Sequence, residues 1–291
     1  MMSRFMRFPG GKPKAVTFSY DDGCMDDMRF SDVITKYGIK GTFNLNGNHR
    51  RALSAEQVKE YMIDRGHEIA VHGLNHRAEG NCLAVEGIKD VLDCRLEMEE
   101  EFGFIIRGMA YPDTGIRCMN NGANYENIKH YLSDLGIVYS RTLAGDNNEF
   151  LMPADWHQWM PTAHHNNPQI FEYIDEFVNL DMSKKTYHAR RYPRLFYMWG
   201  HSYEFGRDNN WERLDEICEK LSGKDDIWYA TNIEIYEYAK AYESLIFSAD
   251  CTMIYNPTLI DVWFDIDGEV YKISSGETLE YNRGRTKWKN I

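Results

Sequence analysis

The chain has 291 residues, of which 43% are hydrophobic and 14% aromatic, so it can form a sizeable core and its composition argues against disorder. Its formal net charge of −12 at pH 7 argues against nucleic acid or an anionic membrane as the main partner. Six scattered cysteines without a C-x-x-C pair favour reduced thiols. The start of the chain lacks the apolar segment of a signal peptide, and no stretch reaches the roughly 18 apolar residues of a membrane helix, so we expect a cytoplasmic protein.

Strand-like and helical segments alternate along most of the chain. Short apolar runs predict strands, apolar residues three and four apart predict helices, and a capping box at Ser54 to Gln57 opens one helix. The predicted order is strand 15–19, helix 26–37, strand 41–46, helix 54–66, strand 67–72, helix 85–102, strand 107–111, helix 124–135, strand 136–141, helix 168–180, strand 195–200, helix 211–221, strand 227–231 and helix 233–245. About seven β-α units in a row imply a parallel sheet, and at this length a closed α/β barrel is expected.

From about residue 249 the pattern changes to short strands. Strands are predicted at 252–255, 261–265, 269–273 and 278–281, with Asp267 and Gly268 as a hairpin turn. We therefore expect two domains, a barrel at residues 1–248 and a small β appendage at residues 249–291 that packs on it.

Three polar clusters follow predicted strands, where a parallel α/β barrel places its active site. The first holds Asp21 and Asp22, the second His72 and His76, and the third His201. Taken alone, each has an ordinary explanation, such as a helix cap or an exposed histidine. Two adjacent carboxylates after an apolar strand, however, need a compensating charge, which a bound cation can supply. Two imidazoles and one carboxylate can hold a divalent metal with open positions.

Hydrolysis is the reaction that this combination favours. Non-haem iron oxygenases use the same ligand set, but on a β scaffold that the alternating pattern does not suggest. A second carboxylate stands beside the predicted ligand, where it can accept a proton from water, and an acid opposite can protonate a leaving nitrogen. A divalent metal lowers the pKa of bound water and polarises a carbonyl.

The three clusters resemble motifs of the polysaccharide deacetylases of carbohydrate esterase family four. The segment from Ser19 to Gly23 is similar to T-F-D-D-G. The segment from His72 to His76 is similar to H-[ST]-x-x-H, except that Gly73 replaces the hydroxyl residue. The apolar strand that ends in His201 resembles the fifth motif. The resemblance covers roughly residues 15–245 and implies a distorted (β/α) barrel with about seven parallel strands.

The resemblance also implies a role for each of these residues. Asp21 would be the general base, and His201 the general acid. Asp22, His72 and His76 would bind the metal, with zinc expected and cobalt, nickel, iron or manganese as alternatives.

Two further motifs depart from the family pattern. The third, R-x-P-Y-G, corresponds to Ala110 to Gly115 here and lacks its arginine. Loss of that cation should raise the pKa of Asp21 unless Arg117, Arg141 or another cation substitutes. The fourth, an Asp and a Trp that support the acid histidine, is only loosely echoed by Asp155, Trp156 and Trp159, and a place in the core is equally expected for both tryptophans.

Other residues are candidates for contact with the substrate. A backbone N–H near Asp113 is an expected oxyanion donor. Tyr111 can offer a face for a sugar ring. His165, beside His164, either lines the cleft or lies in an exposed loop, and Glu204 either orients a substrate or caps the next helix.

The resulting prediction is a metal-dependent hydrolase that removes an N-acetyl group from a sugar or short glycan. Two alternatives stay open, namely an amidase acting on a non-sugar amide, cyclic amides included, and a catalytically inactive carbohydrate-binding barrel. We expect an N-acetylated, carbohydrate-like substrate and neither nucleic acid nor membrane as partner. A homo-oligomer also stays open.

Overall fold

The computed structural model describes residues 3–143, 149–182 and 191–281. These residues divide into two compact units. The large unit comprises residues 15–143, 149–180 and 194–236, and the small unit comprises residues 3–14, 181–182, 191–193 and 237–281. The small unit thus contains residues from both ends of the chain. The predicted domains, residues 1–248 and 249–291, stay a prediction.

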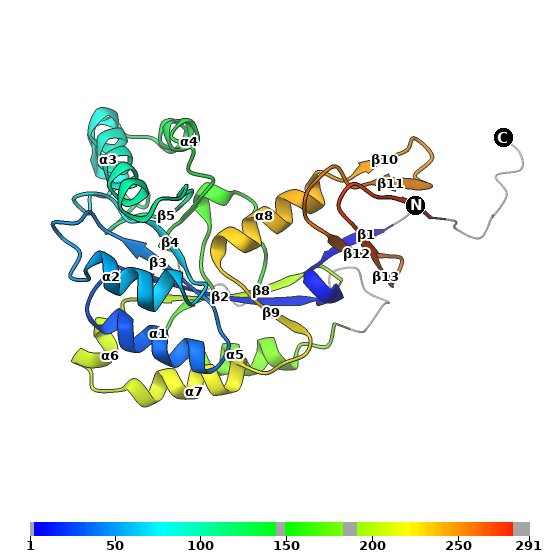
Figure 1. The fold of residues 1–291 in the computed structure, drawn as a ribbon, viewed down its shortest axis with the longest axis horizontal. Helices are drawn as coiled ribbons and strands as arrows, with labels where there is room; N and C mark the ends of the chain where they lie inside the picture. The colour runs from blue at the N-terminus through cyan, green and yellow to red at the C-terminus, as the bar shows by residue number, and fades with distance from the viewer. Residues whose placement is uncertain (1–2, 144–148, 183–190, 282–291) are drawn as a thin grey trace, which may run out of the picture. The chain divides into compact units, whose positions relative to one another are not determined.

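A sheet of eight strands forms the centre of the large unit in the described part of the chain (Figure 1). Neighbouring strands follow the order β6-β5-β4-β3-β2-β8-β7, and β9 pairs with β2. The pairs β2–β3, β3–β4, β4–β5, β5–β6 and β7–β8 are parallel. The strands are β2 (Lys14–Asp21), β3 (Gly41–Leu45), β4 (Glu68–Val71), β5 (Gly108–Ala110), β6 (Tyr139–Arg141), β7 (Ala163–His164), β8 (Arg194–Gly200) and β9 (Ile227–Tyr229).

The segment 159–164 joins the two ends of this sheet. Trp159 forms a parallel bridge with Arg141 at the end of β6, and a few residues later β7 pairs with β8. Between them the Thr162 N–H donates a hydrogen bond of 2.7 Å to the Tyr197 carbonyl. The sheet therefore curls into a distorted (β/α) barrel, and the predicted fold class is confirmed.

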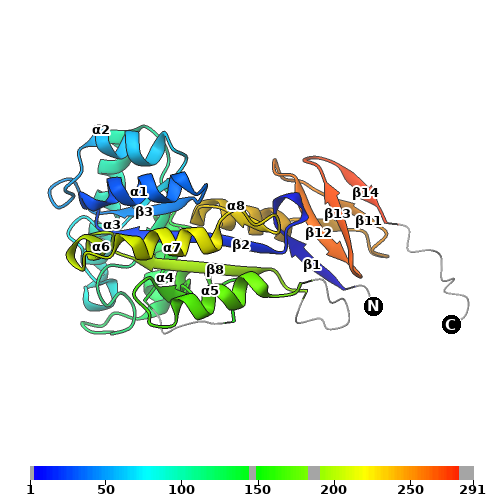
Figure 2. The ribbon, with the colours of Figure 1, turned by 90° about the horizontal axis from the view of Figure 1, so that it is seen from below.

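Helices follow the strands as the apolar periodicity predicted. Helix α1 packs against α7 and α7 against α5, and Figure 2 shows these three side by side. Ser54 and Gln57 form the predicted capping box at the start of α2. The helices are α1 (Asp26–Lys36), α2 (Ala55–Val58), α3 (Ala84–Phe102), α4 (Tyr125–Asp134), α5 (Ile170–Asn179), α6 (Tyr203–Arg207), α7 (Trp211–Leu221) and α8 (Asn232–Glu243). Shorter turns are η1 (Pro9–Gly11), the π-helical η2 (Lys59–Ile63) that continues α2, η3 (Glu79–Asn81) and η4 (Trp156–Gln158).

The core of the large unit lies between the sheet and these helices. All eight residues of β2 are buried, including the polar Thr17, Ser19 and Asp21 that alternate with apolar residues. Phe30 of α1 packs on Tyr20 and Phe43, with ring centroids 3.7 Å and 6.0 Å away. This packing holds β2 and β3 in place and so fixes where the ends of these two strands lie.

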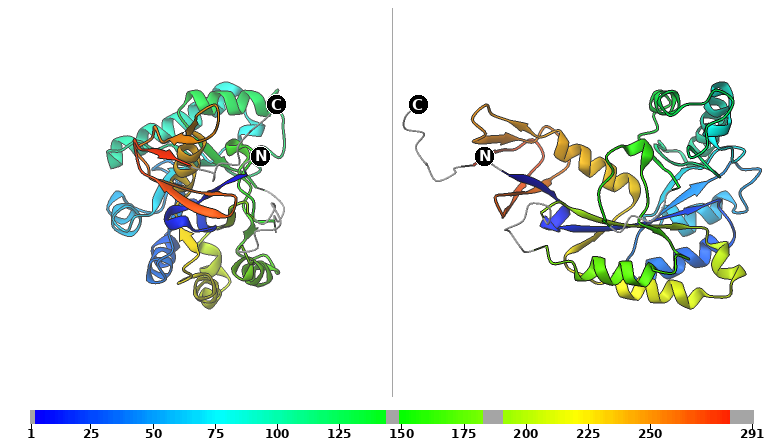
Figure 3. Two further views of the ribbon diagram at one scale, coloured as in Figure 1. Left: turned by 90° about the vertical axis from the view of Figure 1, so that its right-hand side faces the viewer. Right: turned by 180° about the vertical axis from the view of Figure 1, so that it is seen from behind.

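The small unit is formed by antiparallel strands (Figure 3). One sheet has the order β1-β12-β13 and the other β10-β11-β14. Ile266 pairs with Glu269, so Asp267 and Gly268 form the predicted hairpin turn. The sequence pattern does not predict β1, which is stabilised by pairing with the distant β12. The strands are β1 (Arg4–Arg7), β10 (Ile246–Phe247), β11 (Met253–Tyr255), β12 (Val262–Ile266), β13 (Glu269–Ile273) and β14 (Thr278–Glu280).

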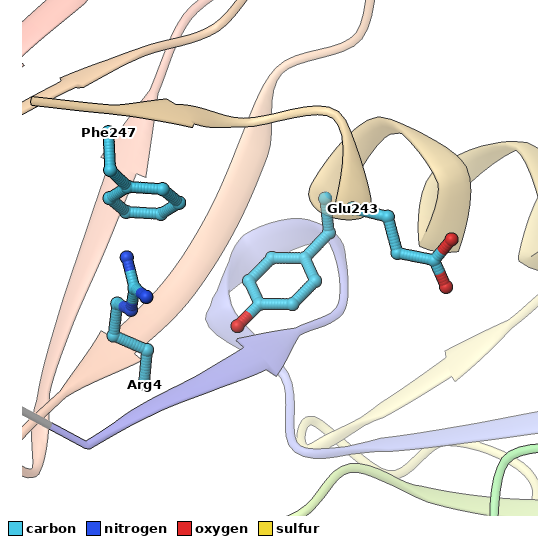
Figure 4. Close-up of a pocket in the computed structure, with 4 residues that line it drawn as sticks. Arg4, Glu243 and Phe247 are labelled. Atoms are coloured by element: carbon cyan, nitrogen blue, oxygen red, sulfur yellow. The ribbon is translucent and has the colours of Figure 1, made fainter.

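The small unit contains a pocket of about 390 Å³ (Figure 4). It is lined by Arg4, Tyr242, Glu243 and Phe247. The Arg4 guanidinium carbon lies 3.7 Å from the centroid of the Phe247 ring, a cation–π distance. This pocket lies outside the three predicted clusters. None of the helices described here is long and apolar enough to cross a membrane.

Candidate active site

Four strand ends of the large unit carry the residues of the candidate site. Asp21 is the last residue of β2, and Asp22 follows it. His72 and His76 follow β4, His201 follows β8, and Arg141 ends β6. Parallel strands of one curled sheet end on the same side, so side chains far apart in sequence meet there.

Asp22, His72 and His76 form a group that fits a divalent metal. Asp22 Oδ1 lies 3.7 Å from His72 Nε2 and 3.4 Å from His76 Nε2. One ligand atom from each residue lies within 4.8 Å of the other two. His72 Nδ1 donates a 2.9 Å hydrogen bond to the Ala110 carbonyl, so the proton of the neutral ring sits on Nδ1 and the lone pair of Nε2 faces Asp22. A metal at Nε2 requires this tautomer, because it binds the lone pair of that nitrogen.

The backbone at this group is held in an uncommon conformation. Asp22 and His76 have positive φ angles, of 83° and 56°, which non-glycine residues seldom adopt. Gly73 has φ of 75°, and a Cβ at that position would collide with Asp90 Oδ2. The glycine that replaces the family's hydroxyl residue is therefore required by the local backbone and packing.

The third motif lacks its arginine, and the sequence left open which cation replaces it. In the structure that cation is Arg141. Its guanidinium donates to Asp21 Oδ2, and both side chains are buried. It also lies 4.6 Å from the centroid of the Trp199 ring. Burial alone would raise the pKa of Asp21, but Arg141, His72 and His201 outweigh it and lower that pKa. Asp21 is thus held as a carboxylate.

Two asparagines from β3 and its end support the carboxylates, and the sequence analysis missed both. Asn44 Nδ2 donates to Asp21 Oδ1 at 2.8 Å, and Asn46 Nδ2 donates to Asp22 Oδ1 at 3.1 Å. The signal in the sequence is their spacing of two, which places both on one face of a strand that neighbours β2.

His201 faces the two carboxylates with one nitrogen and Glu204 with the other. Its Nε2 lies 4.0 Å from Asp21 Oδ2 and 3.9 Å from Asp22 Oδ2, and its Nδ1 lies 3.7 Å from Glu204 Oε1. Burial alone would lower the pKa of His201, but Glu204 and the two aspartates raise it overall. The next residue, Ser202, donates a 2.5 Å hydrogen bond to Asp27 and so anchors this loop to α1.

Glu204 lies close to His201, and both His164 and His165 lie against Glu204. Both His164 Nε2 and His165 Nε2 lie 3.1 Å from Glu204 Oε2. Burial alone would raise the pKa of Glu204, but the three histidines lower it. His165 is fully buried, which differs from an exposed loop position.

The remaining predicted residues lie elsewhere around the strand ends. Asp155 accepts hydrogen bonds from Tyr125 and Lys129, at 2.8 Å and 2.7 Å. Trp156 and Trp159 pack edge to face, 4.9 Å apart, and Trp159 is buried. Both tryptophans therefore pack as an aromatic pair.

Tyr111 and Asp113 contrast in exposure. Tyr111 is buried and its hydroxyl donates to the His157 carbonyl at 3.0 Å, which occupies its polar atom. Asp113 is exposed and has a positive φ of 50°. The predicted oxyanion donor near Asp113 stays a prediction.

Comparison with known families and structures places this geometry in context. The model of the polysaccharide deacetylase family matches residues 9–138. Residues 9–138 are therefore similar to the polysaccharide deacetylase family. A search of curated proteins finds no match.

Several solved structures share the fold of this chain. A candidate polysaccharide deacetylase from Mycobacterium smegmatis aligns with a TM-score of 0.55 and 18% identity, over 83% of this chain and 95% of that one. The Xyl-CE4 domain of a multidomain xylanase from the hindgut metagenome of Trinervitermes trinervoides aligns at 0.50 and 15%, over 79% and 92%. Puue allantoinase aligns at 0.56 and 12%, over 79% and 91%. At these identities the likeness shows the fold alone.

Polysaccharide deacetylases are hydrolases of acetylated carbohydrates and generally use a divalent metal. The matched segment contains Asp21, Asp22, His72 and His76, whereas Arg141, His201 and Glu204 lie beyond it. The assignment of these last three residues therefore rests on the geometry of the large unit.

Proposed function

We propose that this chain removes an acetyl group from the amide nitrogen of a sugar or short glycan. The observation that carries the proposal is the arrangement of Asp21, an ionised and buried carboxylate, next to the group of Asp22, His72 and His76 and opposite His201. This arrangement supplies a base, a metal-binding group and an acid around one point.

Asp22, His72 and His76 would hold the divalent metal, with zinc as the expected ion. A bound metal would lower the pKa of water and polarise the acetyl carbonyl. Zinc suits this set of one carboxylate and two imidazole nitrogens, and cobalt, nickel, iron and manganese bind similar sets.

Asp21 acts as general base in this proposal. Its Oδ1 accepts from Asn44 and its Oδ2 from Arg141, so the side chain is fixed in orientation and remains ionised. It accepts a proton from the water that attacks the acetyl carbon. The C–N bond then breaks, and acetate and an amine leave.

His201 acts as general acid in the same proposal. Its Nε2 faces the two aspartates, and it donates a proton to the nitrogen as the C–N bond breaks. Tyr203, which is exposed and lies 5.2 Å from the His201 ring, is the aromatic side chain that we assign to contact a sugar ring.

The test is acetate release from a panel of N-acetylated mono- and oligosaccharides, together with non-sugar and cyclic amides. Metal-stripped protein restored with zinc or cobalt is compared with Asp21→Asn and with the control Asp32→Asn, an exposed aspartate paired with Arg65. We expect metal-dependent release from the sugars that Asp21→Asn lowers by about 100-fold or more and that Asp32→Asn leaves unchanged.

Two other results would redirect the assignment. Turnover of non-sugar or cyclic amides without turnover of N-acetylated sugars would favour the amidase. Binding of glycans without acetate release under any of the metals would favour the inactive carbohydrate-binding barrel.

A further inference from the structure

A second group of histidines and a carboxylate lies beside the proposed acid. His164, His165 and Glu204 each offer an atom within 4.8 Å of the others, as the metal-binding group does. Such a group can either hold a second metal or serve as a hydrogen-bonded support. The hydrogen bonds at the far side of each imidazole decide between these two roles.

His164 has the tautomer that opposes metal binding. The backbone N–H of Asn166 donates to His164 Nδ1 at 3.1 Å. Because Nδ1 accepts, the proton of the neutral ring sits on Nε2, the nitrogen that lies 3.1 Å from Glu204 Oε2. His164 Nε2 therefore presents an N–H to Glu204 and has no lone pair for an ion.

His165 is fixed beside it by its surroundings. The hydroxyl of Tyr20 lies 3.1 Å from His165 Nδ1, and the ring stacks on Phe205 with centroids 4.2 Å apart. Gly200 leaves the space for this ring, since a Cβ there would overlap it. His165 Nε2 lies 3.1 Å from Glu204 Oε2 but makes no hydrogen bond to a described residue, so His165 packs beside Glu204 without donating to it.

We propose that Glu204, held in place by His164 and Asn166, is the positioning residue of His201. The His164 N–H faces Oε2 and Asn166 Nδ2 donates to Oε2 at 3.4 Å, which leaves Oε1 facing His201 Nδ1 at 3.7 Å. That nitrogen is buried and has no hydrogen-bond partner among the described residues, so Glu204 is the group placed to receive its proton. With the proton on Nδ1 directed at Glu204, Nε2 stays turned toward Asp21 and Asp22.

This inference rests on the proposed function for what His201 does, but its geometry can be tested without it. Glu204→Gln removes the charge and brings an amide that cannot accept from both His164 and His201. Glu204→Asp keeps the charge on a shorter side chain. Asp208→Asn is the matched control, because Asp208 lies at the end of the same helix, exposed and paired with Arg207.

The kinetic test compares two leaving groups. An N-acetylated sugar releases an amine that needs a proton from His201, whereas 4-nitrophenyl acetate releases an anion that needs none. For Glu204→Gln we expect kcat on the sugar to fall about 10- to 100-fold with KM little changed, and hydrolysis of the aryl ester to fall far less. Glu204→Asp should recover part of the loss, and Asp208→Asn should resemble the unmodified protein. Equal losses on both substrates, or a loss confined to KM, would overturn the proposal.

The test that needs no turnover is nitrogen-15 NMR of the histidine rings, with metal analysis of the same samples. We expect His201 protonated at Nδ1, His164 protonated at Nε2 and one equivalent of zinc per chain. Two equivalents, or a His164 Nε2 without its proton, would overturn the proposal in favour of a second metal site. If the protein releases no acetate from any sugar, the proposed function fails, and the NMR result still decides the role of Glu204.

Discussion

The two groups of histidines and carboxylates in the large unit contain the same kinds of residue but differ in what lies behind each imidazole. His72 Nδ1 faces a carbonyl oxygen, whereas His164 Nδ1 faces a backbone N–H. The first contact leaves a lone pair on Nε2, and the second leaves a proton there. One group can therefore bind a cation, while His164 in the other can only donate to a carboxylate. The backbone behind a histidine thus decides its chemistry as much as the side chains in front of it.

The largest effect that this comparison predicts is on metal binding. His72→Ala removes an Nε2 lone pair, so we expect zinc binding to weaken more than 100-fold, roughly the upper end of the effect of removing a group that supports a ligand. His164→Ala, the matched control from the other group, should leave zinc affinity and stoichiometry unchanged. Calorimetric titration of metal-stripped protein measures both. If His164→Ala also lost zinc, the two groups would not differ in metal binding, which would contradict the comparison.

The second prediction concerns the cation beside the metal-binding group. Arg141→Met leaves Asp21 buried without its partner, so we expect metal-stripped protein to lose about 3–5 kcal/mol of stability against urea. Arg141→Lys keeps a charge and should lose less. The pKa of Asp21 rises when the cation is removed, because Arg141 favours its ionised form. Equal stability of the Met and Lys variants would show that the charge of Arg141 has no part in holding Asp21.

A third histidine extends the comparison to pH. His67 Nδ1 accepts from the Gly41 N–H at 3.2 Å and its Nε2 lies 3.0 Å from Thr35 Oγ1, with no carboxylate in these contacts. Burial, with Arg65 and Lys40, lowers the pKa of His67 to about 4. The unfolded chain therefore binds a proton at higher pH than the folded one, and stability should fall as pH drops from about 6.5 toward 4.

His67→Gln should flatten this part of the stability profile by about 2 kcal/mol between pH 7 and pH 5, measured by urea unfolding at each pH. The comparison with the variant is needed because Glu68 acts in the opposite direction. Burial raises its pKa to about 7, so its contribution to stability is lost as pH rises from about 4.5 to 7. An identical pH slope in the variant would contradict the neutral, buried state assigned to His67.

The last prediction concerns Gly73, which lies between His72 and His76. Gly73→Ser restores the residue type that the family motif has, yet we expect it to cost about 1–3 kcal/mol, because φ is 75° and the new Cβ meets Asp90. Gly38→Ser is the matched control, since its φ is 69° and a Cβ there meets nothing. Thermal unfolding of both variants separates the cost of the collision from that of the backbone. Equal losses would mean that Asp90 moves aside.

The fold, and the meeting of Asp21, Asp22, His72 and His76 at one edge of the sheet, could be predicted from the sequence for a physical reason. Strands and helices alternate with clear apolar periods, and Asp21, Asp22, His72 and His76 lie within a few residues of strand ends. Short runs of adjacent residues are enough to identify these strands, helices and strand-end side chains. The five-residue α6 and two-residue β7 are too short to show a period, so they were not predicted.

The supporting contacts could not be predicted in the same way. Arg141 reaches Asp21 only because the curled sheet brings β6 toward β2, and the sequence offered Arg117 as an equal choice. The tautomers of His72 and His164 depend on a carbonyl of Ala110 and an N–H of Asn166, groups that every non-proline residue has. Sequence patterns identify side chains, whereas these assignments depend on the backbone.

One measurement tests the central claim most directly, namely acetate release from an N-acetylated oligosaccharide as zinc is added stepwise to metal-stripped protein. The metal-binding group of Asp22, His72 and His76 predicts that the rate rises with zinc and levels off at one equivalent per chain. A rate that stays at zero at one equivalent, or that keeps rising to two, would contradict it.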